Sequence, residues 1–316
     1  MLELGGVLVG LVLLFFGGNW LVEGASRLAR SLGISPLVVG LTVVALGTSA
    51  PELLVSLSAA LSGSSDIAVG NVVGSNIANI GLILGVSGLI FPISVHVDLL
   101  KREIPIMLVA TVVAVIMFQD GQISRLDGII LVSGLIAFIS FMIVSALRDR
   151  QIQHDPEEEQ RLHPANVNRR VEVLRFLLGF AVLAIGAQVT VGNATQLARN
   201  LGISELVIGI TLISIGTSLP ELVTSMIAAF SKNSDIAIGN VVGSNIFNLL
   251  AILGITSVVQ PINVSPQIAG GEALMMLGFS LLLVPFVINR VLGRRESFVF
   301  LVAYVLFTIY AITIAG

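Results

Sequence analysis

The segment LGISPLVVGLTVVALGTSAPELLVS, which starts at Leu32, recurs as LGISELVIGITLISIGTSLPELVTS, which starts at Leu201. A second segment, SDIAVGNVVGSNIANI from Ser65, recurs as SDIAIGNVVGSNIFNL from Ser234, with the same offset of 169 residues and no gap. More than half of the aligned residues are identical, which chance does not produce. The two halves of the chain are therefore duplicated units.

The composition around these repeats is that of a membrane protein. Of the 316 residues, 55% are hydrophobic and 11% are charged, with a mean hydropathy of +1.02, whereas a soluble domain carries about 25% charged residues. So little charge excludes a cytosolic globular enzyme, a disordered chain and a basic nucleic-acid-binding surface. The chain has no cysteine, which excludes disulfides and thiolate metal sites, and its three histidines are too scattered for a histidine metal site.

Apolar stretches of about 20 residues can each cross a bilayer as a helix. Ten such stretches are present, five on either side of a polar segment. We therefore expect a first five-helix repeat in 1–147, a cytoplasmic linker in 148–171 and a second five-helix repeat in 172–316. The acidic run of the linker could suggest a calcium sensor, but it lacks the glycine-centred spacing of a calcium loop, which favours a solvated linker. The expected spans are 2–24, 37–61, 67–92, 103–118, 124–147, 172–194, 206–230, 236–260, 268–289 and 297–315.

The distribution of Lys and Arg predicts the orientation of these spans. With the linker in the cytoplasm, only Arg125 and Arg199 fall on the opposite side, so both termini are expected outside. Because five is odd, equivalent points of the two halves cross the membrane in opposite directions. The sequence thus predicts an all-α membrane protein with ten transmembrane helices in two inverted five-helix repeats. This is an architecture of secondary transporters, and a symmetric scaffold without transport is the alternative.

Two carboxylates stand in the middle of expected spans, Glu52 in the second and Glu221 in the seventh. An ionised carboxylate at the bilayer centre costs at least about 2.5 kcal/mol. No Lys or Arg is expected at the same depth, so the carboxylates are either protonated or neutralised by a mobile cation. Both outcomes are features of cation transport, whereas a purely structural role for two equivalent glutamates is the alternative.

The motifs GTSAPE (47–52) and GTSLPE (216–221) place proline directly before each carboxylate. A proline in a helix removes a backbone donor, and glycine weakens the helix further. We therefore expect freed carbonyls near Ala45 and Ser214, although a simple proline kink is the alternative. Carbonyls, hydroxyls and carboxylates are hard oxygen ligands, which suit Na⁺ and Ca²⁺ rather than soft transition metals. The hydroxyl residues before the prolines are Thr48, Ser49, Thr217 and Ser218.

The second motif of each repeat, GNVVGSNIxN, adds further oxygen atoms. Ser75 and Asn79 are four residues apart and share a helix face, as do Ser244 and Asn248, so their oxygens can complete a coordination shell. The glycines form small-residue faces, which are expected to press span three against span two and span eight against span seven. Four further asparagines are expected to join helices by hydrogen bonds: Asn71, Asn76, Asn240 and Asn245.

Charge balance at such a site predicts exchange. Glu52 and Glu221 supply one negative charge each, and all other candidate ligands are neutral. One Ca²⁺ neutralises the two carboxylates, and so do two Na⁺ or two protons. A site that holds either Ca²⁺ or monovalent ions, but not both, is an exchanger by mutual exclusion.

The paired motifs GTSxPE and GNxxGSNxxN resemble the α-repeats of the cation/Ca²⁺ antiporter superfamily, and most closely its prokaryotic sodium/calcium exchanger branch. The resemblance covers both halves of the chain. It implies a prokaryotic plasma-membrane protein with ion sites formed by Glu52, Asn79, Glu221 and Asn248. It also implies that Na⁺ is bound by the hydroxyls of Thr48, Ser49, Ser75, Thr217, Ser218 and Ser244, with backbone oxygens near Ala45 and Ser214. Asn at both 79 and 248 argues against K⁺ co-transport, which in relatives accompanies Asp at the latter position.

The resemblance also implies that the first and sixth spans are gating helices. Both are rich in glycine, including Gly10, Gly17, Gly179 and Gly186. Small residues leave a smooth surface, so we expect the two spans to slide together across the core. Close static packing is the alternative role of these glycines.

The sequence thus predicts a Na⁺/Ca²⁺ antiporter, with a Ca²⁺/H⁺ or other divalent cation/proton antiporter as the alternative. A passive cation channel is disfavoured, because channels usually close a pore about an axis along the membrane normal. The chain has no nucleophile–base arrangement and no cofactor motif, so it is not expected to be an enzyme or to carry a cofactor. The expected partners are Ca²⁺, Na⁺ and the lipid bilayer, with no nucleic acid or protein partner.

Overall fold

The computed structural model describes residues 2–152, 168–202 and 214–315. The first half contains α1 (Leu2–Leu32), α2 (Pro36–Val39), η1 (Gly40–Val44), α3 (Ala45–Thr48), α4 (Ala50–Leu61), α5 (Ser65–Ala78), η2 (Asn79–Leu84), α6 (Gly85–Ile90), β1 (Ile93–Ser94), η3 (Leu99–Glu103), α7 (Ile104–Met117), η4 (Phe118–Asp120), β2 (Gln122–Ile123) and α8 (Arg125–Ile152). The second half contains α10 (Arg169–Asn200), α12 (Ser214–Thr217), α13 (Leu219–Phe230), α14 (Ser234–Phe247), η6 (Asn248–Leu253), α15 (Gly254–Val259), β3 (Ile262–Asn263), η7 (Ile268–Glu272), α16 (Ala273–Val287), β4 (Val291–Leu292) and α17 (Arg294–Ala315). The η segments are π-helical, except η4, which is a 3₁₀ turn. The protein is therefore mostly helical, and α8 and α10 extend into the range expected as the linker.

Six helical stretches within the described residues are long and apolar enough to cross a membrane, and the bent pair α2–α3 and α4 can form a seventh. Large apolar side chains are exposed along α1, α8, α10 and α17, as in helices whose solvent is lipid. The chain is thus an integral membrane protein. The six stretches are Leu2–Leu32, Ser65–Ile90, Arg125–Leu147, Arg169–Asn200, Ser234–Val259 and Ile268–Val287.

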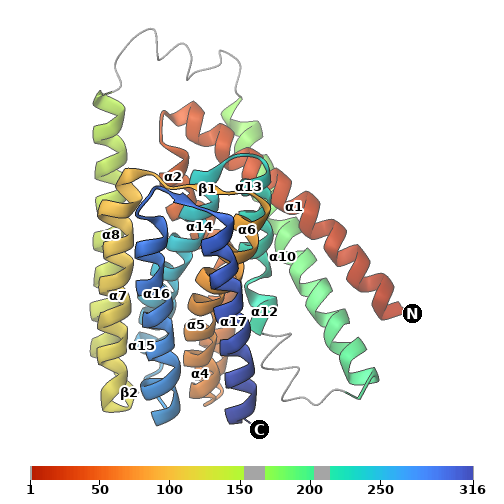
Figure 1. The fold of residues 1–316 in the computed structure, drawn as a ribbon, viewed down its shortest axis with the longest axis vertical. Helices are drawn as coiled ribbons and strands as arrows, with labels where there is room; N and C mark the ends of the chain where they lie inside the picture. The colour runs from red at the N-terminus through yellow and green to blue at the C-terminus, as the bar shows by residue number, and fades with distance from the viewer. Residues whose placement is uncertain (1, 153–167, 203–213, 316) are drawn as a thin grey trace.

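The centre of the bundle is formed by the two helices that carry the GNxxGSN motif. In an apolar 18-residue stretch of Ser234–Val259 every residue is buried, and in that of Ser65–Ile90 72% of the residues are buried. In the corresponding stretches of α1 and α10 only 33% of the residues are buried. Their apolar side chains join those of α7 and α16 in one core. In Figure 1, α1 and α10 lie side by side and are tilted away from this core. The motif-bearing helices are therefore the best shielded from lipid and water.

Two short antiparallel ladders close opposite ends of α7. β1 precedes α7 and pairs with β4, with Ile93 opposite Leu292, whereas β2 follows α7 and pairs with β3, with Ile123 opposite Ile262. Figure 1 shows β1 and β2 at the two ends of the bundle. Each ladder joins one loop from each half of the chain, so the halves are tied together at both ends.

The glycines of α1 and α10 make these two helices one tightly packed pair. A Cβ on Gly17 would lie 3.0 Å from the carbonyl oxygen of Gly179, and a Cβ on Gly10 would lie 3.0 Å from that of Gly186. Only backbones without side chains can approach so closely. The expectation that these glycines form the sliding surface is wrong, because they face the partner helix rather than the core. Gly18 alone of the α1 glycines contacts α13, through Val223 and Ile227.

The small-residue face of α14 also has a different partner from the one expected. A Cβ on Gly239 would lie 3.1 Å from the carbonyl of Leu37, and one on Gly243 would lie 2.6 Å from the carbonyl of Leu41. These glycines therefore press span eight against the first part of span two, in the other half of the chain, and not against span seven. The reason is that another face of α14 is already occupied by α13, to which it is joined through Asn240.

Candidate cation site

The helix that carries Glu52 is broken three residues before this carboxylate. α3 ends at Thr48, Ser49 has φ −84° and ψ 5°, and α4 then starts with Pro51 in its first turn. The two parts of this helix are bent by 43°. Ser218 has nearly the same dihedrals, φ −88° and ψ 6°, directly before α13. Proline suits the first turn of a helix, where its missing N–H has no partner to lose. The motif thus starts a new helix, whose N-terminus favours a carboxylate in its first turn.

Each carboxylate is contacted by a serine of the other half. Ser49 Oγ donates a hydrogen bond to Oε1 of Glu221 at 3.0 Å, and Ser218 Oγ donates one to Oε1 of Glu52 at 3.5 Å. Both glutamates are only 1% exposed. The two broken helices therefore face each other and bring both carboxylates into one buried site.

The two asparagines predicted to complete the site lie where an α-helix changes to a π-helix. η2 begins at Asn79 and packs against α13, and η6 begins at Asn248 and packs against α4. Single π turns are frequent at functional sites, because they turn side chains out of the ordinary helical register. Each asparagine is thereby placed beside the helix that carries the glutamate of the other half.

Buried oxygen atoms at these four residues lack hydrogen-bond partners. Within the described part of the chain, no donor reaches Oε2 of Glu52 or Glu221, or Oδ1 of Asn79 or Asn248. Leaving a buried acceptor unpaired costs about 1–3 kcal/mol, so nearly all are satisfied in folded proteins. No Lys or Arg is among the buried residues described. The arrangement is therefore chemically suited to a cation, which would both neutralise the carboxylates and accept these lone pairs.

Hydroxyl groups surround the same point. Ser218 Oγ also lies 3.3 Å from Ser75 Oγ, and Thr48 Oγ1 lies 3.1 Å from Oδ1 of Asn240. Thr48, Ser75 and Ser244 are buried at 1% exposure or less. Thr217 Oγ1 lies 3.4 Å from Oδ1 of Asn71. The predicted hydroxyl residues with described side chains are thus gathered at or next to the site.

Asparagines hold the backbone of each glutamate in place. Asn71 Nδ2 donates to the carbonyl of Glu52 at 3.2 Å, and Asn240 Nδ2 donates to that of Glu221 at 3.4 Å. Asn245 accepts from Asn79 at 2.9 Å and donates to the carbonyl of Asn76 at 3.4 Å. The expectation that these residues join helices by hydrogen bonds is confirmed for Asn71, Asn240 and Asn245. It is wrong for the side chain of Asn76, which donates to the carbonyl of Val72 in its own helix at 2.8 Å.

The carbonyl of Ala45 is not freed by the proline. It accepts the amide of Ser49 at 3.0 Å and the hydroxyl of Thr48 at 3.3 Å. The expectation is wrong because a proline removes the donor to the carbonyl four residues earlier, and four residues before Pro51 is Gly47 rather than Ala45. Ser214 is the first residue of α12 and directly follows residues outside the described part of the chain.

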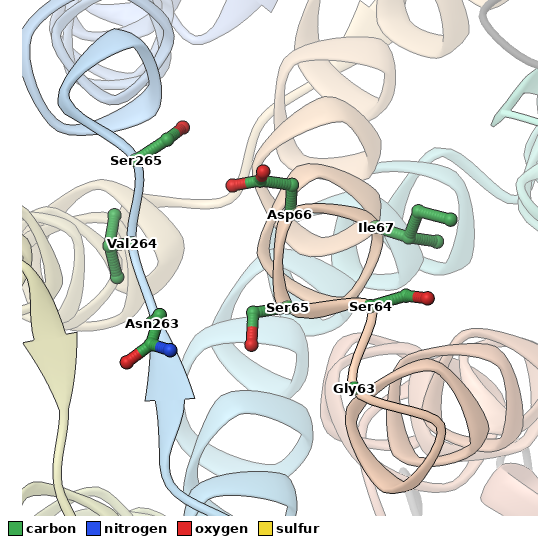
Figure 2. A pocket seen from close by; sticks show the side chains of 8 residues that line it. All are labelled: Gly63, Ser64, Ser65, Asp66, Ile67, Asn263, Val264 and Ser265. Carbon is green, nitrogen blue, oxygen red and sulfur yellow. The ribbon is translucent and has the colours of Figure 1, made fainter.

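A cavity of about 490 Å³ also opens at the junction of α4 and α5, beside residues 263–265. Figure 2 shows the carboxylate of Asp66 pointing from α5 towards this segment, with Ser65 and Asn263 nearby. None of the predicted ligands lines this cavity, and its one carboxylate is exposed. It is therefore distinct from the buried site between the broken helices.

Two further buried glutamates were missed by the sequence analysis. Glu172, at the start of α10, is 4% exposed and pairs with Arg27 at 3.4 Å and Arg175 at 3.3 Å. Its i,i+3 spacing from Arg175 is the sequence signal that could have identified it. Glu103, at the end of η3, is 3% exposed. The burial of Glu103 depends on tertiary packing, which no local sequence pattern predicts.

Comparison with known proteins identifies the family and supports the fold. The family described as "Sodium/calcium exchanger protein" matches residues 2–144 and 171–313. A relative from Alkalimonas amylolytica, "Putative antiporter CaxA", is 38% identical over 306 residues, which cover 95% of each chain. The "Sodium/calcium exchanger MaX1" of Methanosarcina acetivorans is 35% identical over 339 residues, with 96% of each covered. A solved structure of the sodium-calcium exchanger NCX_Mj superposes with a TM-score of 0.84 at 33% identity, covering 96% of this chain and 97% of that one.

The fold and the buried oxygen-rich site define a membrane antiporter of cations. The chain belongs to the sodium/calcium exchanger family, in the prokaryotic branch of the cation/Ca²⁺ antiporter superfamily. The resemblance seen in the repeated motifs is thereby confirmed.

Proposed function

We propose that this protein exchanges Na⁺ for Ca²⁺ across the membrane, by alternating access at one shared central site. The observation that carries the proposal is the set of four unpaired buried oxygens on Glu52, Asn79, Glu221 and Asn248, with no buried basic side chain described to balance the two carboxylates. One Ca²⁺ satisfies the charge of both carboxylates, and so do two Na⁺. The two ions therefore compete for the same groups.

Ligands are assigned in two classes in this proposal. The two glutamates and two asparagines bind Ca²⁺, and the hydroxyls of Thr48, Ser49, Ser75, Thr217, Ser218 and Ser244 contribute to Na⁺ binding. Backbone oxygens at Ala45 and Ser214 would add to the Na⁺ sites. For Ala45 this requires that its carbonyl exchange the Thr48 hydroxyl for the ion.

Ten transmembrane helices in two inverted five-helix repeats complete the proposal, with both termini outside a prokaryotic plasma membrane. The ladders support inversion. β1 and its counterpart in the repeat, β3, belong to ladders on opposite ends of α7, because β3 pairs with β2. The reciprocal bonds Ser49–Glu221 and Ser218–Glu52 support a two-fold relation between the halves.

The moving part in this proposal is the α1–α10 pair. Its glycine-lined interface and two ion pairs between the helices, Arg27–Glu172 and Arg175–Glu23, make it one body. The site, in contrast, is held by hydrogen bonds between α4, α5, α13 and α14. A slide of the pair across this core would open one side of the site and close the other.

A second candidate is Ca²⁺/H⁺ exchange, because two protons could also neutralise the two carboxylates. Uptake of ⁴⁵Ca²⁺ into proteoliposomes separates the candidates. An outward Na⁺ gradient should drive uptake, and a pH gradient of equal size should not. Uptake driven by the pH gradient alone would establish proton exchange instead, and uptake driven by neither would refute both.

A further inference from the structure

The side-chain amide of Asn79 carries two different atoms, of which only one suits a cation. Its Oδ1 is buried without a hydrogen-bond partner among the described residues, whereas its Nδ2 donates to Oδ1 of Asn245 at 2.9 Å. The oxygen can bind a cation, but the NH₂ group is a hydrogen-bond donor and cannot. Half a turn about the terminal torsion of the side chain would exchange the two atoms with almost no change in shape. A contact outside the site must therefore decide which atom faces an ion.

Asn245 is held in one orientation by groups that only accept hydrogen bonds. Its Nδ2 donates to the carbonyl oxygen of Asn76 at 3.4 Å and to Sδ of Met107, on α7, at 3.7 Å. A carbonyl oxygen and a thioether have no hydrogen to donate, so neither could bind Oδ1 of Asn245 if its amide were reversed. The NH₂ group of Asn245 therefore faces these two acceptors, and its oxygen faces Asn79.

These contacts form a directional series of hydrogen bonds that ends at the cation site. The acceptors at Met107 and Asn76 fix the amide of Asn245, and the oxygen of Asn245 then binds the NH₂ group of Asn79. The three asparagines are each 1% exposed and Met107 is fully buried, so bulk water does not compete for these bonds. Oδ1 of Asn79 is thereby left as the atom available to an ion.

The repeat equivalent of Asn245 makes no such contact. Asn76 stands 169 residues earlier, is equally buried, and donates through its side chain to the carbonyl of Val72 in its own helix at 2.8 Å. Among the described residues, no hydrogen bond joins the side chain of Asn76 to Asn248, the repeat equivalent of Asn79. The duplicated sequence thus supplies a matched control for Asn245.

We propose that Asn245 is a positioning residue of the cation site, which holds the amide of Asn79 so that its oxygen, and not its nitrogen, faces the ion. The proposal rests on the proposed function, in which Asn79 binds Ca²⁺. Groups that orient a metal ligand by a hydrogen bond are typically worth about 10- to 100-fold in metal affinity, although they do not touch the metal. Asn245 acts in this way through Asn79 alone.

The test is Ca²⁺ binding by calorimetry with the purified full chain, together with thermal unfolding of each variant. Asn245→Leu nearly keeps the shape of the side chain but removes the acceptor for Asn79, so the Ca²⁺ dissociation constant should rise about tenfold or more. Asn76→Leu is the matched control. It should leave the Ca²⁺ affinity close to that of the wild-type protein, because the Asn76 side chain is bonded to its own helix and to no proposed ligand.

A second comparison separates orientation from packing. In the Asn79→Asp protein both terminal atoms of residue 79 are oxygens, so the orientation of this group no longer matters. Asn245→Leu should then cost much less Ca²⁺ affinity than it does in the wild-type background, as expected of two residues that act together. A merely structural role of Asn245 would give the same loss in both backgrounds.

Met107→Leu tests the same series of bonds without changing an asparagine. It removes the thioether that accepts from Asn245, and should weaken Ca²⁺ binding by a smaller factor than Asn245→Leu does. Met276→Leu, the equivalent change at a fully buried position of α16, is the control and should not. Because Met and Leu replace each other in cores at little cost, this pair gives a result even where Asn245→Leu unfolds.

The outcomes distinguish this proposal from the proposed function. Equal Ca²⁺ affinities of the Asn245→Leu and Asn76→Leu proteins would overturn the positioning role, as would equal losses in the two backgrounds. Where Asn245→Leu unfolds, equal affinities of the Met107→Leu and Met276→Leu proteins would overturn it. Each of these results leaves the proposed exchange intact as long as Asn79→Leu weakens Ca²⁺ binding. Unchanged binding by Asn79→Leu would instead refute Asn79 as a ligand, and the positioning role with it.

Discussion

Removing one charge from the site should abolish Ca²⁺ transport while leaving the fold intact. Glu52→Gln keeps the shape of the side chain, which is buried at 1% exposure, and keeps the acceptor that Ser218 contacts at 3.5 Å. It removes one of the two negative charges of the site. Because no basic side chain among the buried residues described pairs with Glu52, the lost charge releases no buried counter-charge.

The size of the effect follows from Coulomb's law. Two unit charges 4 Å apart attract by about 4 kcal/mol at an effective dielectric constant of about 20, and the double charge of Ca²⁺ raises this to about 8 kcal/mol. If half of this is cancelled because the carboxylate no longer needs to be desolvated, about 4 kcal/mol remains. Since 1.4 kcal/mol is a factor of ten, the Ca²⁺ dissociation constant should rise about a thousandfold. For a single Na⁺ the Coulomb attraction is half as large, about 4 kcal/mol, and the same desolvation term cancels most of it, so the loss of Na⁺ affinity should be small.

The assay is ⁴⁵Ca²⁺ uptake into proteoliposomes, with insertion checked by protease protection and with calorimetric Ca²⁺ binding on the same preparation. Glu296→Gln, the same chemical change in the first turn of α17, is the matched control and should transport like the wild-type protein. Glu221→Gln should behave like Glu52→Gln. Wild-type uptake by correctly inserted Glu52→Gln protein would refute the proposed site.

Three further predictions follow from the same contacts. Raising the Na⁺ concentration or lowering the pH below neutrality should weaken Ca²⁺ binding measured by calorimetry. Na⁺ needs the same carboxylates, and a protonated carboxyl is a poor ligand. A Ca²⁺ affinity that changes with neither would exclude competition at one site. Gly243→Ala should destabilise the protein by about 1–3 kcal/mol in thermal unfolding, because the added Cβ would lie 2.6 Å from the Leu41 carbonyl. Gly278→Ala is the control and should show no such loss, because a Cβ there would meet no atom of another described element within 4 Å. A disulfide between Gly18→Cys and Val223→Cys, which ties α1 to α13, should block exchange. One between Gly6→Cys and Asn193→Cys, which ties α1 to α10, should not, because the atoms nearest to a Cβ on Gly6 belong to the Asn193 side chain that is replaced. Full exchange in the first variant would contradict a sliding pair.

The carboxylates and their neighbours were predictable from the sequence because their chemistry is costly in a membrane. A charged glutamate inside an apolar stretch costs free energy that some partner must offset. Because Glu52 and Glu221 stand at equivalent repeat positions, a cation shared by both is the simplest partner. The proline before each also indicated irregular backbone, and the break at Ser49 confirms it. These predictions relied on local sequence and on the offset between the repeats alone.

Partners across the two halves could not be predicted in this way. The sequence places Gly239 and Gly243 on one helix face, but which helix covers that face depends on the packing of the whole bundle, and the contact falls on span two rather than span seven. The π turns at Asn79 and Asn248 were likewise invisible. A π turn is not stabilised by local interactions, and packing against neighbouring helices is what stabilises it. No residue preference in the sequence therefore predicts where one forms.

Reciprocal contacts between the halves explain why one site, and not two, results from the duplication. Oε1 of each glutamate accepts a hydrogen bond from a serine of the other half, which leaves Oε2 of both buried and without a partner among the described residues. A divalent ion that engages one Oε2 therefore lowers the cost of ionising the other carboxylate, because like charges at close range disfavour each other unless a cation intervenes. Half-occupied states are costly for the same reason. In the proposed exchanger, this coupling favours states in which both carboxylates are neutralised, by one Ca²⁺ or by monovalent ions. It disfavours a change of access while the site holds no ion. Such a change would let one ion cross without the other and would uncouple the Na⁺ gradient from the Ca²⁺ gradient.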